Sequence, residues 1–372
     1  MGGADVSGLA ARAERAVAVL TYWLLFLVPA WASVAANSKP RLASTAGKAA
    51  EPAWLIAGLL LTLLIGFRYQ VGGDWLTYEA HYFEILGAPL SEVLVKGDPG
   101  YYLLLWLSGE LNGGVYAVNM AFGLIFSWGL VTFCRDQPRP WLALAVAMPY
   151  MVTVVAMGYS RQGVALGLAM LGLAGLARSK VLYFVICVAL AATFHKSAVM
   201  LVPIAVLATP RSRLWTGLWV GIAAGLLYFL LLADSVDGLV VNYIDAQYQS
   251  EGAGIRIAMN VLPAGLLLLL RNRFVWPPVQ RNLWTMLSLL ALASVPWLLL
   301  SGSSTAVDRL ALYLIPLQLY VFSRLPDLLG RGSGRRIWVV ATVAYYGVVL
   351  FVWLNFATHA YLWLPYRSYF LQ

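Results

Sequence analysis

The run PAWLIAGLLLTLLIGFR at residues 52–68 carries no charge before its final arginine. A helix rises about 1.5 Å per residue, so a run of this length comes close to crossing a bilayer core about 30 Å thick. Inside lipid, a helix satisfies all the backbone polar groups of a single segment. The run therefore predicts a transmembrane helix, and similar apolar runs recur along the whole chain.

The composition extends this prediction to the entire protein. Of the 372 residues, 61% are hydrophobic and 11% are charged, whereas soluble globular domains carry about 25% charged residues. The two cysteines, Cys134 and Cys187, lack the paired spacing of a zinc site. We therefore expect an all-α, polytopic integral membrane protein in which residues 1–372 form a single transmembrane domain with no separate soluble domain.

Proline, glycine and charge clusters divide the apolar sequence into about twelve predicted spans. These spans cover residues 16–36, 52–68, 113–133, 141–157, 162–177, 181–195, 197–209, 214–233, 255–271, 282–300, 308–323 and 337–355. Two longer connections lie at about 69–112 and 234–254. Within the first, the apolar segment 99–112 is too short to span, and we expect it to form a short interfacial helix.

Positive charge is distributed unevenly between the two sides of this topology. Alternate connections hold most of the 25 lysines and arginines and few acids. By the positive-inside rule these connections face the cytoplasm, which leaves both termini and the longer connections outside. Arg12 and Arg15 oppose an outside N-terminus. The net charge of +9 thus reflects cytoplasmic loops facing anionic lipid, and we expect no nucleic-acid partner.

The first motif that could carry chemistry is FRYQVGGDWLTY, residues 67–78. Its glycine pair permits a tight turn that places Asp74 near the membrane surface. If a helix begins there, Asp74 caps it and Tyr78 lies one turn further along the same face. Arg68 stands at a predicted span end, where an arginine either snorkels toward water or binds a ligand.

Two further motifs lie at the predicted outer ends of spans. GYSRQG places Arg161 and Gln162 in a turn where a cation is disfavoured, so Arg161 needs an acid or an anionic ligand as partner. FHKS places His195 beside Lys196 between two short spans, where both are costly without a polar cavity. Since a lone buried histidine is more often a satisfied core residue than a catalyst, both interpretations of His195 stay open.

The motif DRLALY, which starts at Asp308, opens a predicted span from the same side. An acid near a helix N-terminus favours the helix dipole, so helix capping is one interpretation of Asp308. A cation near a helix N-terminus is unfavourable, so helix stability does not explain the presence of Arg309. Tyr313 lies one turn further along the same helix. The cationic residues at span ends on this side are Arg68, Arg161, Lys196, Arg256 and Arg309.

Such a cationic rim suits an anionic headgroup, most simply a lipid-linked phosphate or pyrophosphate. The chain contains no P-loop, dinucleotide fingerprint, GxSxG elbow or HExxH zinc motif. ATP-driven and metalloprotease functions therefore lose their support.

In order and spacing, these motifs resemble the EpsG-like branch of the Wzy-type polysaccharide polymerases. The resemblance also rests on DPGYYLL at residues 98–104 and extends from about the second to the eleventh predicted span. Asp98 and Asp308 stand where that family more often has glutamate. The resemblance implies a GT-C-like helical bundle and a glycosyltransferase that uses no nucleotide-sugar donor, metal or cofactor.

The resemblance also implies a location and a substrate. It predicts an enzyme of the bacterial inner membrane whose active site faces the periplasm. The enzyme would join oligosaccharide repeat units carried on undecaprenyl pyrophosphate into exopolysaccharide, capsule or O-antigen chains. Flippase and chain-length regulator proteins would be its partners.

Carried onto the matching positions, the resemblance predicts which residues act. Asp74 and His195 are alternative general bases for the acceptor hydroxyl. The residues expected to bind pyrophosphate and sugar are Arg68, Arg161, Lys196, Arg309, Tyr78, Asp308, Tyr313 and Gln162. The cations among them would neutralise the charge that develops on the leaving pyrophosphate.

Two other functions stay open. A transporter or flippase for the same lipid-linked oligosaccharide would share the cationic cavity, although no inverted repeat is visible in the sequence. A membrane O-acyltransferase would use His195 as its base. Its thioester donor would arrive from the cytoplasm, opposite the side predicted for that histidine.

Overall fold

The computed structural model describes residues 3–36, 52–209, 213–232 and 250–371, and within these ranges it is helical with no β-strand. An isolated antiparallel bridge joins Arg68 to Ser368, near the C-terminus. The prediction of an all-α chain is confirmed for the described residues.

The α-helices alternate with short 3-10 and π segments. The α-helices are α1 (Gly3–Ala35), α2 (Pro52–Gly66), α3 (Trp75–Ile85), α4 (Leu90–Val93), α5 (Pro99–Glu110), α6 (Gly114–Arg135), α7 (Pro140–Ala147), α8 (Ser160–Leu176), α9 (Val181–Phe194), α10 (Val202–Ala208), α11 (Arg213–Leu227), α13 (Ala253–Leu270), α14 (Pro278–Leu300), α15 (Ser304–Ala311), α16 (Pro316–Phe322), α17 (Leu325–Leu329) and α18 (Gly334–Phe356). The other segments are η2 (Met148–Ala156), η3 (Lys196–Leu201), η4 (Tyr228–Leu232), η7 (Arg271–Arg273), η8 (Leu312–Leu314), η9 (Ala360–Leu362) and η10 (Tyr369–Leu371).

Five helices of the described chain are long and apolar enough to cross a membrane, judged by length and composition. They are Ala18–Ala35 within α1, α6, Ala253–Arg273, α14 and α18. A sixth qualifies if Ser304–Leu314 and Pro316–Leu329, bent by 42°, count as one span. Shorter apolar helices occupy Pro52–Gly66, Pro140–Ala156, Val181–Phe194, Lys196–Ala208 and Leu214–Leu230. These helices indicate a membrane protein, but the predicted count of twelve spans is not confirmed.

Several of the predicted spans are not continuous α-helices, and two of them show the reason clearly. The span at 141–157 passes from α7 into the π-helix η2 at Met148, next to Pro149. The span at 308–323 changes at Leu312 into a 3-10 turn just before Pro316. Proline has no backbone N–H and clashes with the preceding turn, which explains why regular helix hydrogen bonding changes at both places.

Helix α8 occupies the centre of the bundle. Nearly all of its residues are buried, in accord with a sequence that is apolar around the whole helix. Helices α6 and α9 pack against it, and α2 packs on α6. A Cβ atom added to Gly129 of α6 would lie 2.1 Å from the carbonyl oxygen of Gly167 in α8, so these two backbones are in direct contact.

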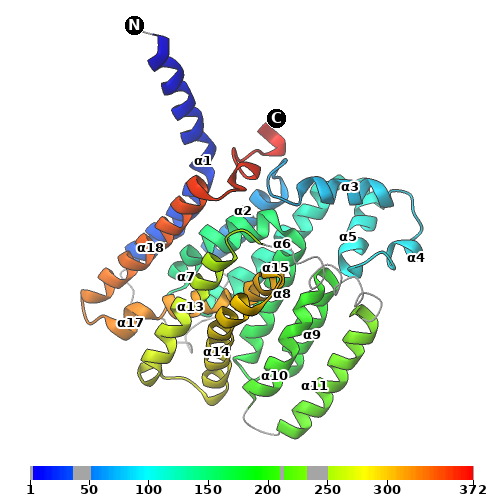
Figure 1. Ribbon diagram of the computed structural model, residues 1–372, viewed down its shortest axis with the longest axis vertical. Helices are drawn as coiled ribbons and strands as arrows, with labels where there is room; N and C mark the ends of the chain where they lie inside the picture. The colour runs from blue at the N-terminus through cyan, green and yellow to red at the C-terminus, as the bar shows by residue number, and fades with distance from the viewer. Residues whose placement is uncertain (1–2, 37–51, 210–212, 233–249, 372) are drawn as a thin grey trace.

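The remaining helices surround this centre, as Figure 1 shows. Helices α1 and α18 lie side by side at one edge, while α9, α10 and α11 form the opposite edge. Helices α13, α14 and α15 pack together. Helices α3, α4 and α5 gather beyond one end of α6. One continuous core of buried apolar side chains reaches from Tyr22 in α1 to Trp363 near the C-terminus.

The connection predicted at residues 69–112 folds into the three short helices α3, α4 and α5. Segment 99–112 forms α5, which begins at Pro99, a residue favoured in the first turn. Its helical nature is confirmed, and its interfacial position stays a prediction. The other long connection, predicted at 234–254, lies mostly outside the described residues.

Candidate active site

Asp74 and Tyr78 lie at the start of α3. Asp74 is the N-cap residue of this helix, although its side chain makes no capping hydrogen bond. Its Oδ2 instead accepts a hydrogen bond of 3.0 Å from the hydroxyl of Tyr78, one turn later. Tyr78 is only 2% exposed. The predicted placement of these two residues on one face is confirmed, and the carboxylate is held by a buried phenol.

Gly72 seats the loop before α3 against the segment that leads into α8. Its φ is +105°, and a Cβ atom here would lie 2.2 Å from the carbonyl oxygen of Met157. Glycine alone has both the conformation and the space for this contact. The backbone N–H of Asp74 then donates to the carbonyl of Gly158 at 3.3 Å. Asp74 is thereby fixed beside the turn that carries Arg161.

Arg161 lies in the first turn of α8 and contacts both α3 and α5. Its Nη1 donates to Oδ2 of Asp98 at 3.2 Å, and its backbone N–H donates to the hydroxyl oxygen of Tyr78 at 3.3 Å. Its guanidinium carbon lies 5.1 Å from the ring centroid of Tyr101, within cation–π range. The side chain of Arg161 stays 30% exposed. Of the two partners expected for Arg161, an acid or an anionic ligand, the structure shows an acid, Asp98.

Burial and neighbouring charge set the protonation states of these groups. Burial raises the pKa of Asp74, against the hydrogen bond from Tyr78 and the charges of Arg161 and Arg309. Burial likewise raises the pKa of Asp98, against the charge of Arg161. It also raises the pKa of Tyr78, so this phenol stays protonated and donates to Asp74. A carboxylate with a raised pKa is a stronger proton acceptor than an ordinary aspartate.

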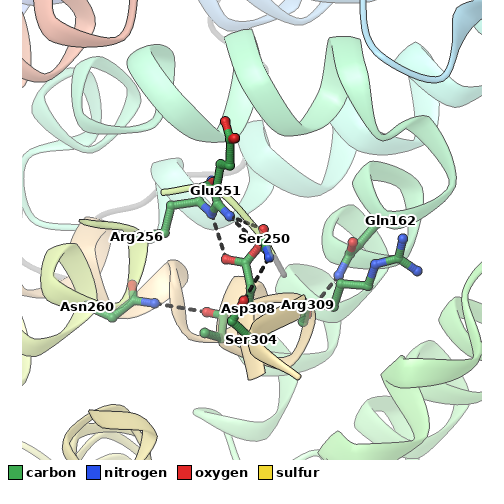
Figure 2. A network of polar contacts seen from close by, with 9 residues as sticks. Gln162, Ser250, Glu251, Arg256, Asn260, Ser304, Asp308 and Arg309 are labelled. Carbon is green, nitrogen blue, oxygen red and sulfur yellow. Dashed lines mark hydrogen bonds and ion pairs between the residues drawn. The ribbon is translucent and has the colours of Figure 1, made fainter. Parts of the chain in front are cut away.

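Arg309 belongs to α15 and is connected to the first turn of α8 through Gln162. Nε2 of Gln162 donates to the backbone carbonyl of Arg309 at 2.8 Å. Figure 2 shows these two residues next to each other, with the side chains of Arg309 and Asp308 leaving α15 in different directions. Arg309 is close enough to Asp74 to lower its pKa. Helix α15 thus supplies a second cation beside Asp74.

Asp308 is bound by Arg256 from α13 (Figure 2). Nε and Nη2 of Arg256 each lie 2.6 Å from a carboxylate oxygen of Asp308, which makes a bidentate pair. The hydroxyl of Ser250 donates to the same carboxylate at 3.0 Å. Since the N-cap of α15 is Ser303, Asp308 does not cap that helix. The expected contact of Asp308 with substrate stays a prediction.

His195 lies at the break between α9 and η3. Its Nδ1 is 2.6 Å from Oγ of Ser197, whose hydroxyl donates to the hydroxyl oxygen of Tyr313 at 3.2 Å. When Ser197 donates its hydrogen to Tyr313, the matching tautomer of His195 carries its hydrogen on Nδ1 and has Nε2 as the acceptor. This tautomer keeps His195 available as the alternative base.

Electrostatic interactions join this break to the rest of the site. Arg161 and Arg309 both lie close enough to His195 for their positive charges to affect its protonation. The positive charge of Lys196 lies close enough to Asp98 to favour its ionised form. The four polar motifs, separated along the sequence, therefore meet at one place in the bundle.

Arg68 is completely buried next to that place. Its Nη2 lies 2.6 Å from Oγ of Ser160 and 3.1 Å from Oδ1 of Asn119, and its other nitrogens donate to the carbonyls of Ile65 and Val71. These contacts join α2 and α6 to the start of α8. Burial contradicts the snorkelling interpretation of Arg68, and its expected contact with pyrophosphate stays a prediction.

Three contributors to the site have partners that the local sequence does not reveal: Asp98, Tyr101 and Arg256. Asp98 pairs with Arg161 over 63 positions, and Arg256 pairs with Asp308 over 52. The one sequence signal for these pairs is a charge left uncompensated at a span end. In the part of the chain that the structure describes, no three His, Cys, Asp or Glu side chains are grouped as metal ligands would be.

The chain was compared with models of protein families, with curated proteins and with solved structures. The family model described as the EpsG family matches residues 53–368, a range that contains every motif of the site. No curated protein and no solved structure matches the chain. The matched residues cover most of the sequence, so the chain belongs to the EpsG family, a family of Wzy-like polysaccharide polymerases, as its motifs predict.

Proposed function

We propose that the protein joins oligosaccharide repeat units carried on undecaprenyl pyrophosphate into a bacterial surface polysaccharide, at the periplasmic face of the inner membrane. Membership of the EpsG family supports a polymerase that uses lipid-linked glycans in a membrane. The observation that carries the finer proposal is the position of Arg161, which is paired with Asp98 and lies beside Asp74.

Arg161 and Arg309 bind the pyrophosphate of the donor in this proposal, with Lys196 as a further cation. Guanidinium groups present paired donors that match phosphate oxygens. The donor must compete with Asp98 for Arg161. Burial removes water from the Asp98 carboxylate and raises its pKa. The loss of hydration offsets part of the attraction between Asp98 and Arg161, so a pyrophosphate displaces Asp98 more easily than it would displace a fully hydrated carboxylate.

The transfer step forms one bond and breaks another. The oxygen of the acceptor hydroxyl attacks the anomeric carbon of the donor glycan while its proton passes to Asp74. The bond between that carbon and the pyrophosphate oxygen breaks, and undecaprenyl pyrophosphate leaves with the electron pair. The arginines neutralise the charge that grows on the leaving group, a contribution typically worth about 10²- to 10³-fold in rate for each donor.

Asp74 is our first choice for the base, and His195 is the alternative. Asp74 adjoins Arg161 through Tyr78, so an acceptor hydroxyl at Asp74 lies next to a pyrophosphate at Arg161. The phenol of Tyr78 orients the carboxylate by binding Oδ2. Positioning of the base before reaction is part of how enzymes lower such barriers.

We assign positioning roles to three residues expected to bind substrate. Gln162 holds α15 against α8, Asp308 holds α15 against α13, and Arg68 holds the start of α8 against α2 and α6. Tyr313 supports His195 through Ser197. In the cell we propose that a flippase delivers the substrate and that a chain-length regulator acts on the product.

Incubation of the purified protein with a synthetic lipid-pyrophosphate repeat unit, without nucleotide, tests the proposal. We expect a ladder of elongated glycans and release of the lipid pyrophosphate, both lost in Arg161→Ala. Movement of the lipid-linked unit across proteoliposomes without elongation would identify a transporter instead. Acylation of the glycan by a supplied thioester would identify an O-acyltransferase.

A further inference from the structure

A second polar group lies on α3, one turn beyond Tyr78. His81 follows Asp74 by seven residues, so two helical turns place both side chains on the same face. Nδ1 of His81 lies 3.0 Å from the hydroxyl oxygen of Tyr101, whose ring also packs below Arg161. The rings of His81 and Tyr102 lie 5.9 Å apart between centroids.

The contact with Tyr101 fixes the imidazole and leaves its opposite nitrogen available. Tyr101 is completely buried, and burial raises its pKa, so its phenol stays protonated. His81 itself is half-buried. Since Nδ1 faces the buried phenol, Nε2 lies on the opposite side of the ring. A neutral imidazole placed in this way can exchange a hydrogen bond with a hydroxyl group.

The charges around His81 balance. The positive charges of Arg161 and Lys96 disfavour protonation of His81, and the negative charges of Glu84 and Asp74 favour it. Tyr101 and Tyr102 of α5 are the other titratable groups that face it. Burial, then Arg161, lowers the pKa of His81, which favours the neutral ring. A balanced group of this kind suits an uncharged, hydroxyl-rich ligand better than a phosphate.

An ion pair joins two segments of this group. Nζ of Lys96 binds Oε1 of Glu84, which joins the segment before α5 to α3 one turn beyond His81. Helices α3, α4 and α5 lie at the side of the molecule away from α14 and α18 (Figure 1). Arg161 therefore contacts the group around His81 through Tyr101, while its neighbour Gln162 contacts Arg309.

We propose that His81 and Glu84 bind the sugar of the acceptor repeat unit, beside Tyr101 and Arg161. This inference rests on the proposed function and deepens it by placing the acceptor glycan along α3, with its reacting hydroxyl at Asp74 and a neighbouring sugar hydroxyl at Nε2 of His81. The pyrophosphate of the donor then occupies the Arg309 side.

The test varies the concentration of a soluble acceptor glycan at saturating donor lipid and compares His81→Gln with wild type. We expect the KM for acceptor to rise at least tenfold, with binding of a sugar-free polyprenyl pyrophosphate unchanged. In wild type this KM should also rise as falling pH protonates His81, and His81→Gln should lose that dependence. The matched control is His359→Gln, an exposed histidine on another part of the chain.

The outcomes separate this inference from the proposed function. If wild type makes no polymer, the proposed function fails. If wild type makes polymer and His81→Gln keeps the acceptor KM and its pH dependence, the acceptor subsite is wrong. Should His81→Gln fail to fold, Glu84→Gln decides, because Glu84 is exposed: an unchanged acceptor KM in that variant overturns the proposal.

Discussion

The side-chain amide of Gln162 donates a hydrogen bond of 2.8 Å to the backbone carbonyl of Arg309, over 147 positions of sequence. This bond connects the first turn of α8, which carries Arg161, to α15, which carries Arg309. A buried amide therefore helps to set the separation of the two arginines proposed to bind pyrophosphate.

Gln162→Met should lower turnover by on the order of tenfold to a hundredfold, because methionine keeps the length of the side chain and removes the donor that places Arg309. The assay is single-turnover elongation of the lipid-linked repeat unit. The matched control is Gln280→Met, which removes a bond from a glutamine amide to the carbonyl of Ala177. Equal rates in the two variants would contradict the positioning role.

Substitution of the arginines by lysine tests how the pyrophosphate is bound. Arg161→Lys and Arg309→Lys should each lower the rate by about 10²- to 10³-fold, because lysine keeps the charge but cannot offer two parallel donors. Arg273→Lys is a control, since that exposed arginine lies outside the site. Full activity in Arg161→Lys would reduce Arg161 to a structural cation.

What the sequence predicts correctly here is local. The relation between Asp74 and Tyr78 follows from helical spacing, and the all-α chain follows from apolar composition. The ion pairs of Arg161 with Asp98 and of Arg256 with Asp308 join distant segments, and spacing within one helix carries no information about them. The sequence predicts only that each charge at membrane depth needs a counter-charge, and it does not identify the residue that supplies it.

The number and continuity of the spans are also set by contacts between helices. A run of apolar residues has the same composition whether it forms one straight helix or a bent pair. The 42° bend between α15 and α16 and the π-helix η2 arise where prolines interrupt the regular bonding and neighbouring helices fix the new path.

The pair of Arg256 and Asp308 should contribute mainly to stability. Their side chains are 19% and 10% exposed, so loss of one partner should cost on the order of 2 kcal/mol, less than for a fully buried pair. We expect Asp308→Asn and Arg256→Met each to lower the melting temperature, with a double variant less destabilised than the sum. A stable but inactive Asp308→Asn would instead favour direct substrate contact.

The orientation of the chain can be measured by thiol labelling. In a background without Cys134 and Cys187, which are both buried, cysteine replaces one of two exposed serines. Ser91→Cys should react with a membrane-impermeant reagent in intact spheroplasts, because residues 69–112 are predicted to lie outside. Ser333→Cys should react only after lysis. The reverse pattern would move the site to the cytoplasmic face.

In the proposed mechanism Asp74, beside Arg161, takes the proton of the acceptor hydroxyl. The most direct test is the rate of elongation as a function of pH in wild type and in Asp74→Asn. Asparagine caps a helix about as well as aspartate and can still accept the hydrogen bond from Tyr78, so the substitution keeps the shape and this contact while it removes the basicity and the negative charge.

In wild type the rate should fall as pH falls through the pKa of Asp74, at a higher pH than for an ordinary aspartate because burial raises that pKa. Asp74→Asn should lower the rate by about a hundredfold or more, remove this limb of the pH profile and leave donor-lipid affinity unchanged. His195→Gln should retain the limb. A nearly wild-type profile in Asp74→Asn, together with an inactive His195→Gln, would contradict the claim and assign the base to His195.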